Sequence, residues 1–173
     1  MNSGQITSIV AAIFTIIATY VFYWFSFSND AGTHFVNGIG FLKNALDLWL
    51  NPNTNANKYG LPLVFYFFFL VVFLLFIASP ILQLLGIKTK YGPLIGCIMP
   101  LLIGAFILLY AFLGFAPVFI NWLGMFGDLE PLIEGFFPLT LAVEGRYEFY
   151  GTYILVAAGI ISLIAGLKGP GTF

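Results

Sequence analysis

The sequence predicts an all-α integral membrane protein, an antiparallel four-transmembrane-helix bundle with short amphipathic helices in two outer loops. Hydrophobic residues make up 61% of the 173-residue chain and charged residues 8%, against roughly 45–50% and 25% in soluble proteins. The apolar residues gather in four runs without Asp, Glu, Lys, Arg or His, each long enough to cross a hydrocarbon core of ~30 Å as a helix. A soluble domain is excluded because its surface needs more charge, and a disordered chain because disorder needs low hydrophobicity.

The four predicted helices follow one another within a single membrane domain, residues 1–173. They cover residues 6–27, 61–87, 91–115 and 149–167, and the outer loops cover residues 28–60 and 116–148. We expect the first run to be a retained helix rather than a signal peptide, because its apolar stretch is long and no Lys or Arg precedes it. Pro80 and Pro100 are expected to kink the second and third helices, since each removes one helical hydrogen bond.

Positive charges set the expected orientation of these helices. Lys88 and Lys90 lie in the short turn between the second and third helices, and Lys168 follows the fourth. Cytoplasmic segments of membrane proteins carry an excess of Lys and Arg. We therefore expect both termini on the cytoplasmic side of the cell membrane and both long loops on the outer side.

The first outer loop carries a helical pattern of its own. Its apolar residues repeat at helical spacing, at positions 35, 39, 42, 46 and 49. Lys43, Asn44 and Asp47 fall off this stripe. The pattern predicts a short amphipathic helix over residues 35–50 that lies in the outer membrane interface.

The second outer loop resembles part of the first. Residues 35–41 read FVNGIGF and residues 119–125 read FINWLGM, and both loops end in Tyr-Gly. This similarity suggests a duplicated helix–interfacial segment–helix unit, with chance similarity among common membrane residues as the alternative. Trp24, Trp49 and Trp122 are expected at the membrane–water interface, because indole combines an apolar body with a polar N–H.

Small residues repeat every four positions on the third and fourth predicted helices, and such stripes let helix backbones approach closely in lipid. The members are Gly92, Gly96, Pro100 and Gly104 on the third helix and Ala158, Ser162 and Gly166 on the fourth. We expect these positions to form the helix contacts. The second helix is crowded with phenylalanine, and we expect Phe65, Phe69 and Phe73 to face lipid or another subunit.

The chain has few residues that could act in catalysis, metal binding or proton transfer. The predicted helices hold no ionisable Asp, Glu, Lys, Arg or His, whereas pumps and coupled transporters usually need such groups within the membrane. His34 is the only histidine and Cys97 the only cysteine, so we expect no catalytic residue and no metal site. His34, Asp30 and Trp49 form the one candidate, the edge of a quinol site with His34 as the titrating group. A solvated loop histidine is the alternative.

These observations favour a non-catalytic integral membrane subunit that packs within a larger membrane complex, of a respiratory type or in a cell-surface assembly. Its expected partners are lipid and other membrane subunits. Nucleic acid is not expected as a partner, because the net charge is −1 and no basic stripe is present. We expect no cofactor of its own, with lipid or quinone as the bound molecules to consider. The alternatives are a quinol-site-forming subunit of a membrane oxidoreductase and a small oligomeric channel.

Overall fold

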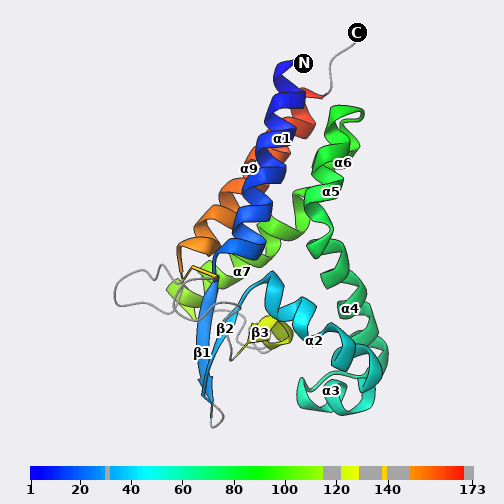
Figure 1. Ribbon diagram of the computed structural model, residues 1–173, viewed down its shortest axis with the longest axis vertical. Coiled ribbons are helices and arrows are strands. Elements are labelled where there is room, and N and C mark those ends of the chain that lie inside the picture. The colour runs from blue at the N-terminus through cyan, green and yellow to red at the C-terminus, as the bar shows by residue number, and fades with distance from the viewer. Residues whose placement is uncertain (30–31, 115–121, 129–137, 140–148, 170–173) are drawn as a thin grey trace.

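The computed structural model describes residues 1–29, 32–114, 122–128, 138–139 and 149–169. Within these residues the protein is mainly helical (Figure 1). The helices are α1 (Ser3–Ile16) with its π-helical extension η1 (Ile17–Val21), α2 (Gly38–Leu50), α3 (Pro52–Lys58), α4 (Leu63–Ile77), α5 (Ser79–Leu84), the 3₁₀ turn η2 (Leu85–Ile87), α6 (Tyr91–Gly96), α7 (Ile98–Leu113), the 3₁₀ turn η3 (Leu123–Phe126) and α9 (Tyr150–Lys168). The strands are β1 (Phe25–Asn29), β2 (Gly32–Val36) and β3 (Gly127–Asp128).

Three helical segments of the described chain are long and apolar enough to cross a membrane: Ser3–Val21, Tyr91–Leu113 and Tyr150–Lys168. A fourth is added if α3 and α4, which meet at 93°, count as one broken span. These long apolar helices indicate an integral multi-pass membrane protein, as predicted, with three or four candidate spans.

The predicted second helix, residues 61–87, is broken into α4, α5 and η2. The break falls at Ala78, next to Pro80 in the first turn of α5, because a proline ring and its missing N–H are tolerated at the start of a helix but not inside it. The third predicted helix is likewise divided at Cys97 into α6 and α7. The sequence predicted kinks in both helices, and the breaks lie two and three residues before the prolines.

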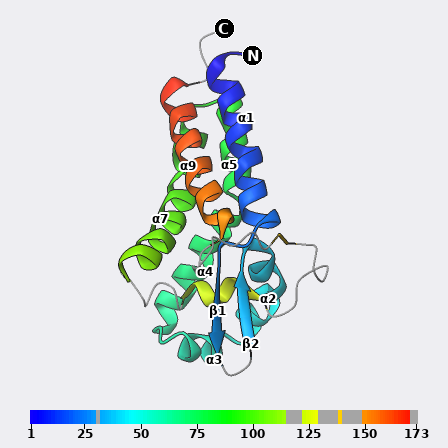
Figure 2. The ribbon, with the colours of Figure 1, turned by 90° about the vertical axis from the view of Figure 1, so that its left-hand side faces the viewer.

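Both described chain ends and the turn after η2 lie at one end of the molecule, which we call the terminal end (Figure 1). There Lys168 Nζ lies 3.2 Å from Ser3 Oγ, and Gln5 Nε2 donates to Ile87 O at 2.9 Å. The strands, α2, α3 and η3 gather at the opposite end, which we call the loop end. Helices α1 and α9 run side by side between the two ends (Figure 2).

A three-stranded antiparallel sheet at the loop end was not predicted. Strands β1 and β2 form a hairpin whose register runs from Phe25 opposite Val36 to Asn29 opposite Gly32, and β3 pairs with β2. The predicted first helix therefore ends at Val21 rather than at residue 27. Residues 25–28 alternate Phe-Ser-Phe-Ser, which is the period of a strand rather than of a helix, and the preceding apolar run concealed that change.

The amphipathic helix of the first loop is present, but it begins at Gly38 rather than at residue 35. Residues before it belong to β2, and the Asn37 side chain caps the helix by accepting a hydrogen bond from the Gly40 N–H at 3.0 Å. Asparagine is among the best residues for such a cap. The buried residues of α2 include Phe41 and Leu48, which lie off the predicted stripe.

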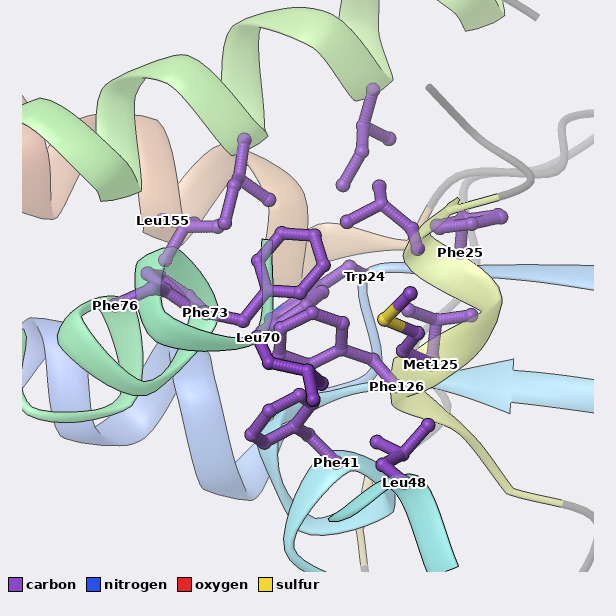
Figure 3. Packing of buried hydrophobic residues seen from close by; sticks show 14 of the residues in the cluster. Trp24, Phe25, Phe41, Leu48, Leu70, Phe73, Phe76, Met125, Phe126 and Leu155 are labelled. Atoms are coloured by element: carbon purple, nitrogen blue, oxygen red, sulfur yellow. The ribbon is translucent and has the colours of Figure 1, made fainter. Parts of the chain in front are cut away.

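The main hydrophobic core lies at the loop end and is built largely of aromatic rings (Figure 3). Phe126 of η3 is at its centre, with ring centroids 4.7 Å from Phe41 and 4.8 Å from Phe73. Trp24 is fully buried between Phe76 and Phe126 and donates its indole N–H to Ala18 O at 2.7 Å. Trp24 therefore presents neither its ring nor its N–H to a membrane–water interface, because the core buries both.

Candidate functional site

The outer face of α4 is an exposed apolar surface that leads to the loop end. Val64 is 80% exposed and Phe68 59% exposed, and Phe65 and Val71 are also exposed on this helix. Monomeric soluble proteins rarely expose contiguous apolar patches of this kind, and such patches mark contacts with lipid or protein. The surface does not include Phe73.

The three phenylalanines that the sequence predicted on one outer face lie in three different environments. Phe65 is exposed, Phe69 is half-buried and packs on Trp122 at a centroid distance of 4.4 Å, and Phe73 is 1% exposed. The prediction that Phe73 faces lipid or a partner is wrong, because its ring packs between Phe41 and Phe126. The part of the second helix that became α4 is apolar or aromatic at every position, so the sequence could not separate its inner face from its outer one.

Helix α2 adds a second apolar strip to this surface. Leu46 is 71% exposed, and Leu42, Trp49 and Leu50 are exposed as well. The Trp49 ring lies 5.9 Å from the ring of Phe67 on α4, so the strip borders α4. We give the name apolar shoulder to eight of the exposed apolar residues of these two helices: Val64, Phe65, Phe68 and Val71 of α4, and Leu42, Leu46, Trp49 and Leu50 of α2.

His34 lies on β2, away from the bundle of spanning helices. Its ring stacks on Phe27 at 5.0 Å with an interplanar angle of 10°. Burial lowers the pKa of His34, and the positive charge of Lys58 lowers it further, against a smaller opposing effect of Asp128. Asp128 in turn pairs with Lys43 of α2 at 2.5 Å. We therefore expect the His34 ring to be neutral at any pH above the ordinary histidine pKa.

The predicted quinol edge is not assembled from its three residues in the described chain. His34 and Trp49 belong to β2 and α2 and contact different rings, Phe27 and Phe67. Asp30 lies outside the described residues, as do Glu144, Arg146 and Glu148. Among the residues that the structure describes, no group of three or more His, Cys, Asp or Glu side chains could hold a metal ion.

The predicted small-residue stripes are buried between helices. A side chain on Gly166 would meet Leu94, one on Gly104 would meet Val156, and one on Gly96 would meet Gln83. Ser162 also donates its hydroxyl to Pro93 O at 2.8 Å. The remaining stripe positions, Gly92, Pro100 and Ala158, are buried as well.

Sequence reasoning missed four polar side chains that are buried between α1 and α5. They are Gln5, Ser8, Ser79 and Gln83. A signal for the first two was present, because Gln5, Ser8, Thr15 and Thr19 lie on one face of a helix at spacings of three, seven and four residues. This polar face is easily missed because it lies inside an otherwise mainly apolar run.

The comparisons with known proteins add no relative. No protein-family model matches the chain, and neither a curated protein nor a solved structure matches it significantly.

Proposed function

We propose that the protein is a non-catalytic integral membrane subunit that packs within a larger membrane complex through its apolar shoulder. The observation that carries this proposal is the position of the shoulder. Its exposed apolar side chains lie on α4 and α2 at the loop end, while α1 and α9 run from the terminal end toward it. The partner is a different membrane subunit, and both termini lie on the cytoplasmic side of the cell membrane.

One hydrogen bond joins the end of α4 to η1 and so relates α4 to the first spanning segment. Tyr20 Oη donates to Ile77 O at 2.9 Å, so the end of α4 lies beside the end of η1. From that point α4 leads away from the terminal end, next to α2 and α3 (Figure 1). A membrane that fits α1 and η1 therefore meets only the last part of α4.

Helix lengths support a protein partner for the exposed face of α4. The 19 residues from Ser3 to Val21 rise ~28 Å, which is about the thickness of the hydrocarbon core. The 15 residues of α4 add ~22 Å beyond the joint with η1. The first turns of α4, with Val64, Phe65 and Phe68, then lie past the acyl chains, where exposed apolar rows need cover from another subunit.

Photo-crosslinking tests this proposal directly. A photoreactive phenylalanine analogue replaces Phe68 in cells that make the protein, and the same analogue replaces Ile160 as the matched control. Ile160 is 47% exposed on α9, which spans the membrane. We expect a discrete adduct with a second, different polypeptide from position 68 and lipid adducts alone from position 160.

Two results would contradict the proposal. The first is that position 68 gives lipid adducts alone, as position 160 does. The second is that position 68 gives an adduct of twice the chain mass, which indicates self-association. The quinol-site and channel alternatives remain predictions, and no contact within the described residues favours either.

A further inference from the structure

A row of uncharged polar side chains runs along the contact between α1 and α5. Each is at most 4% exposed, and the other residues of α1 and α5 are apolar except Ser3 and Thr7. We call this row the polar seam; its members are Gln5, Ser8, Thr15, Thr19, Ser79 and Gln83. Part of it is joined by direct hydrogen bonds: Ser8 Oγ donates to Gln83 O at 2.7 Å, and Gln83 Nε2 donates to Gly96 O at 3.1 Å.

The other part of the polar seam has no direct partner. Thr15 Oγ1, Thr19 Oγ1, Ser79 Oγ and Gln83 Oε1 are buried and make no hydrogen bond with any residue that the structure describes. A buried polar group without a partner is strongly disfavoured, and more so in a membrane, where the surrounding acyl chains offer no hydrogen bonds. Among the described residues, these four oxygens therefore lack the hydrogen-bond partner that a buried polar group needs.

The antiparallel packing of the two helices brings these oxygens along one line. Ser8 lies opposite Gln83, and Tyr20 lies opposite Ile77, so Thr15 and Ser79 fall between these two contacts. Ser79 and Gln83 are four residues apart on one face of α5, as Thr15 and Thr19 are on α1 and η1. These four groups thus follow one another along α1, η1 and α5, and Thr19 also lies against Gly38 at the start of α2.

We propose that ordered water molecules occupy the polar seam and bridge Thr15, Thr19, Ser79 and Gln83. Gln83 Oε1 only accepts hydrogen bonds, whereas the three hydroxyl groups can both donate and accept. A ligand that satisfies all four must therefore donate to Gln83 Oε1 and can accept from the hydroxyls. Water has this capacity and is the usual partner of buried polar groups that protein atoms leave unpaired. The seam holds no charged side chain that would recruit an ionised ligand.

The position of the water gives it a structural role. The seam ends at η1 and at the break between α4 and α5, where two helices depart from α-helical geometry. Such departures leave backbone carbonyls less completely paired, and water commonly satisfies them. Hydration of the seam would thus support the joint from which α4 leads toward the loop end.

Water-edited solid-state NMR of the full chain in lipid bilayers tests the proposal. The measurement follows polarisation transfer from water protons to the Cβ carbons of Thr15, Ser79 and Gln83. Leu155 and Ala158, fully buried on α9, serve as dry controls. We expect transfer to the seam to build up several-fold faster than transfer to the controls. Equal, slow transfer at both would overturn the proposal, because the hydroxyls would then bond carbonyls of their own helices.

The variant Thr15→Val gives a second, independent readout. Valine has nearly the shape of threonine, with a methyl group in place of the hydroxyl. If water bridges that hydroxyl, the variant lowers the unfolding temperature and slows transfer to Ser79. An unchanged or raised unfolding temperature would overturn the proposal, since it would mean that the hydroxyl had no partner to lose. The wild-type NMR measurement decides the question if the variant fails to fold.

Discussion

Near the termini the helices of this protein meet through glycine, serine and threonine, whereas at the loop end they meet through phenylalanine and tryptophan. Helix α9 approaches α6 closely enough that a side chain on Gly166 would collide with Leu94. At the loop end, the rings of Trp24, Phe76 and Phe126 pack against one another and fill the space between the elements. The two halves therefore satisfy different packing requirements within one chain.

The difference fits the placement proposed above, with the loop end beyond the acyl chains and the other half within them. Acyl chains are as apolar as the side chains that they touch, so helices in lipid gain little from hiding apolar surface and associate through close approach and hydrogen bonds. A region in contact with water gains from burying large rings, at about 25 cal/mol per Å² of apolar surface. The aromatic core therefore resembles the interior of a soluble domain attached to a membrane bundle.

Truncation of the aromatic core is expected to have the largest effect. Trp24→Ala should lower the free energy of unfolding by about 3–5 kcal/mol, because it leaves a large cavity between Phe76 and Phe126 and removes the donor to Ala18 O. Denaturant titration in detergent measures the loss. Trp49→Ala is the control, since Trp49 is 41% exposed. An equal loss in both variants would mean that Trp24 does not hold the loop end together.

Crowding of the close helix contact should have the next largest effect. Gly104→Leu places a side chain against Val156 of α9 and should cost about 1–3 kcal/mol, as overpacking does. Its neighbour Ala105 is exposed on the same helix, so Ala105→Leu adds a similar side chain without a contact to crowd. Thermal unfolding should separate the two variants. Indistinguishable melting curves would show that the α7–α9 contact is not close.

Acidification should produce the smallest effect, and only at the loop end. The pKa of His34 is lowered by burial and by Lys58, so the unfolded chain binds a proton at higher pH than the folded chain. Stability is therefore retained above the ordinary pKa of about 6.5 and is lost as the pH falls from there through the lowered value. Unfolding of wild type and of His34→Gln, compared at neutral and acidic pH, checks this expectation. A pH dependence that the variant retains in full would assign it to other groups.

The sequence predicted the membrane helices well and the loop end poorly, for a physical reason. Long runs without charge admit few structures other than spanning helices, so the ends of the segment Tyr91–Leu113 and of α9 lie within two residues of those predicted. The hairpin begins inside the apolar run that predicted the first helix, and its alternating Phe and Ser contribute to the same hydrophobicity. A helix and a buried strand cannot be separated by hydrophobicity alone over so short a segment.

The candidate surface could be predicted only in part. Phe65 is exposed as expected, but Phe73 faces the core because α2 and η3 pack against that side of α4. No local pattern in α4 reports this choice, since the helix is apolar on every side. The polar seam, by contrast, was readable on α1, while its continuation on Ser79 and Gln83 depends on how the broken second helix packs.

Native mass spectrometry of the protein extracted in mild detergent tests most directly whether the apolar shoulder is covered by another subunit. The measurement weighs the intact assembly before its contacts are lost. We expect a species that contains the 19.1 kDa chain together with at least one different polypeptide, and its loss when Phe68 and Val64 are replaced by serine. A single chain that carries lipid alone would contradict the account.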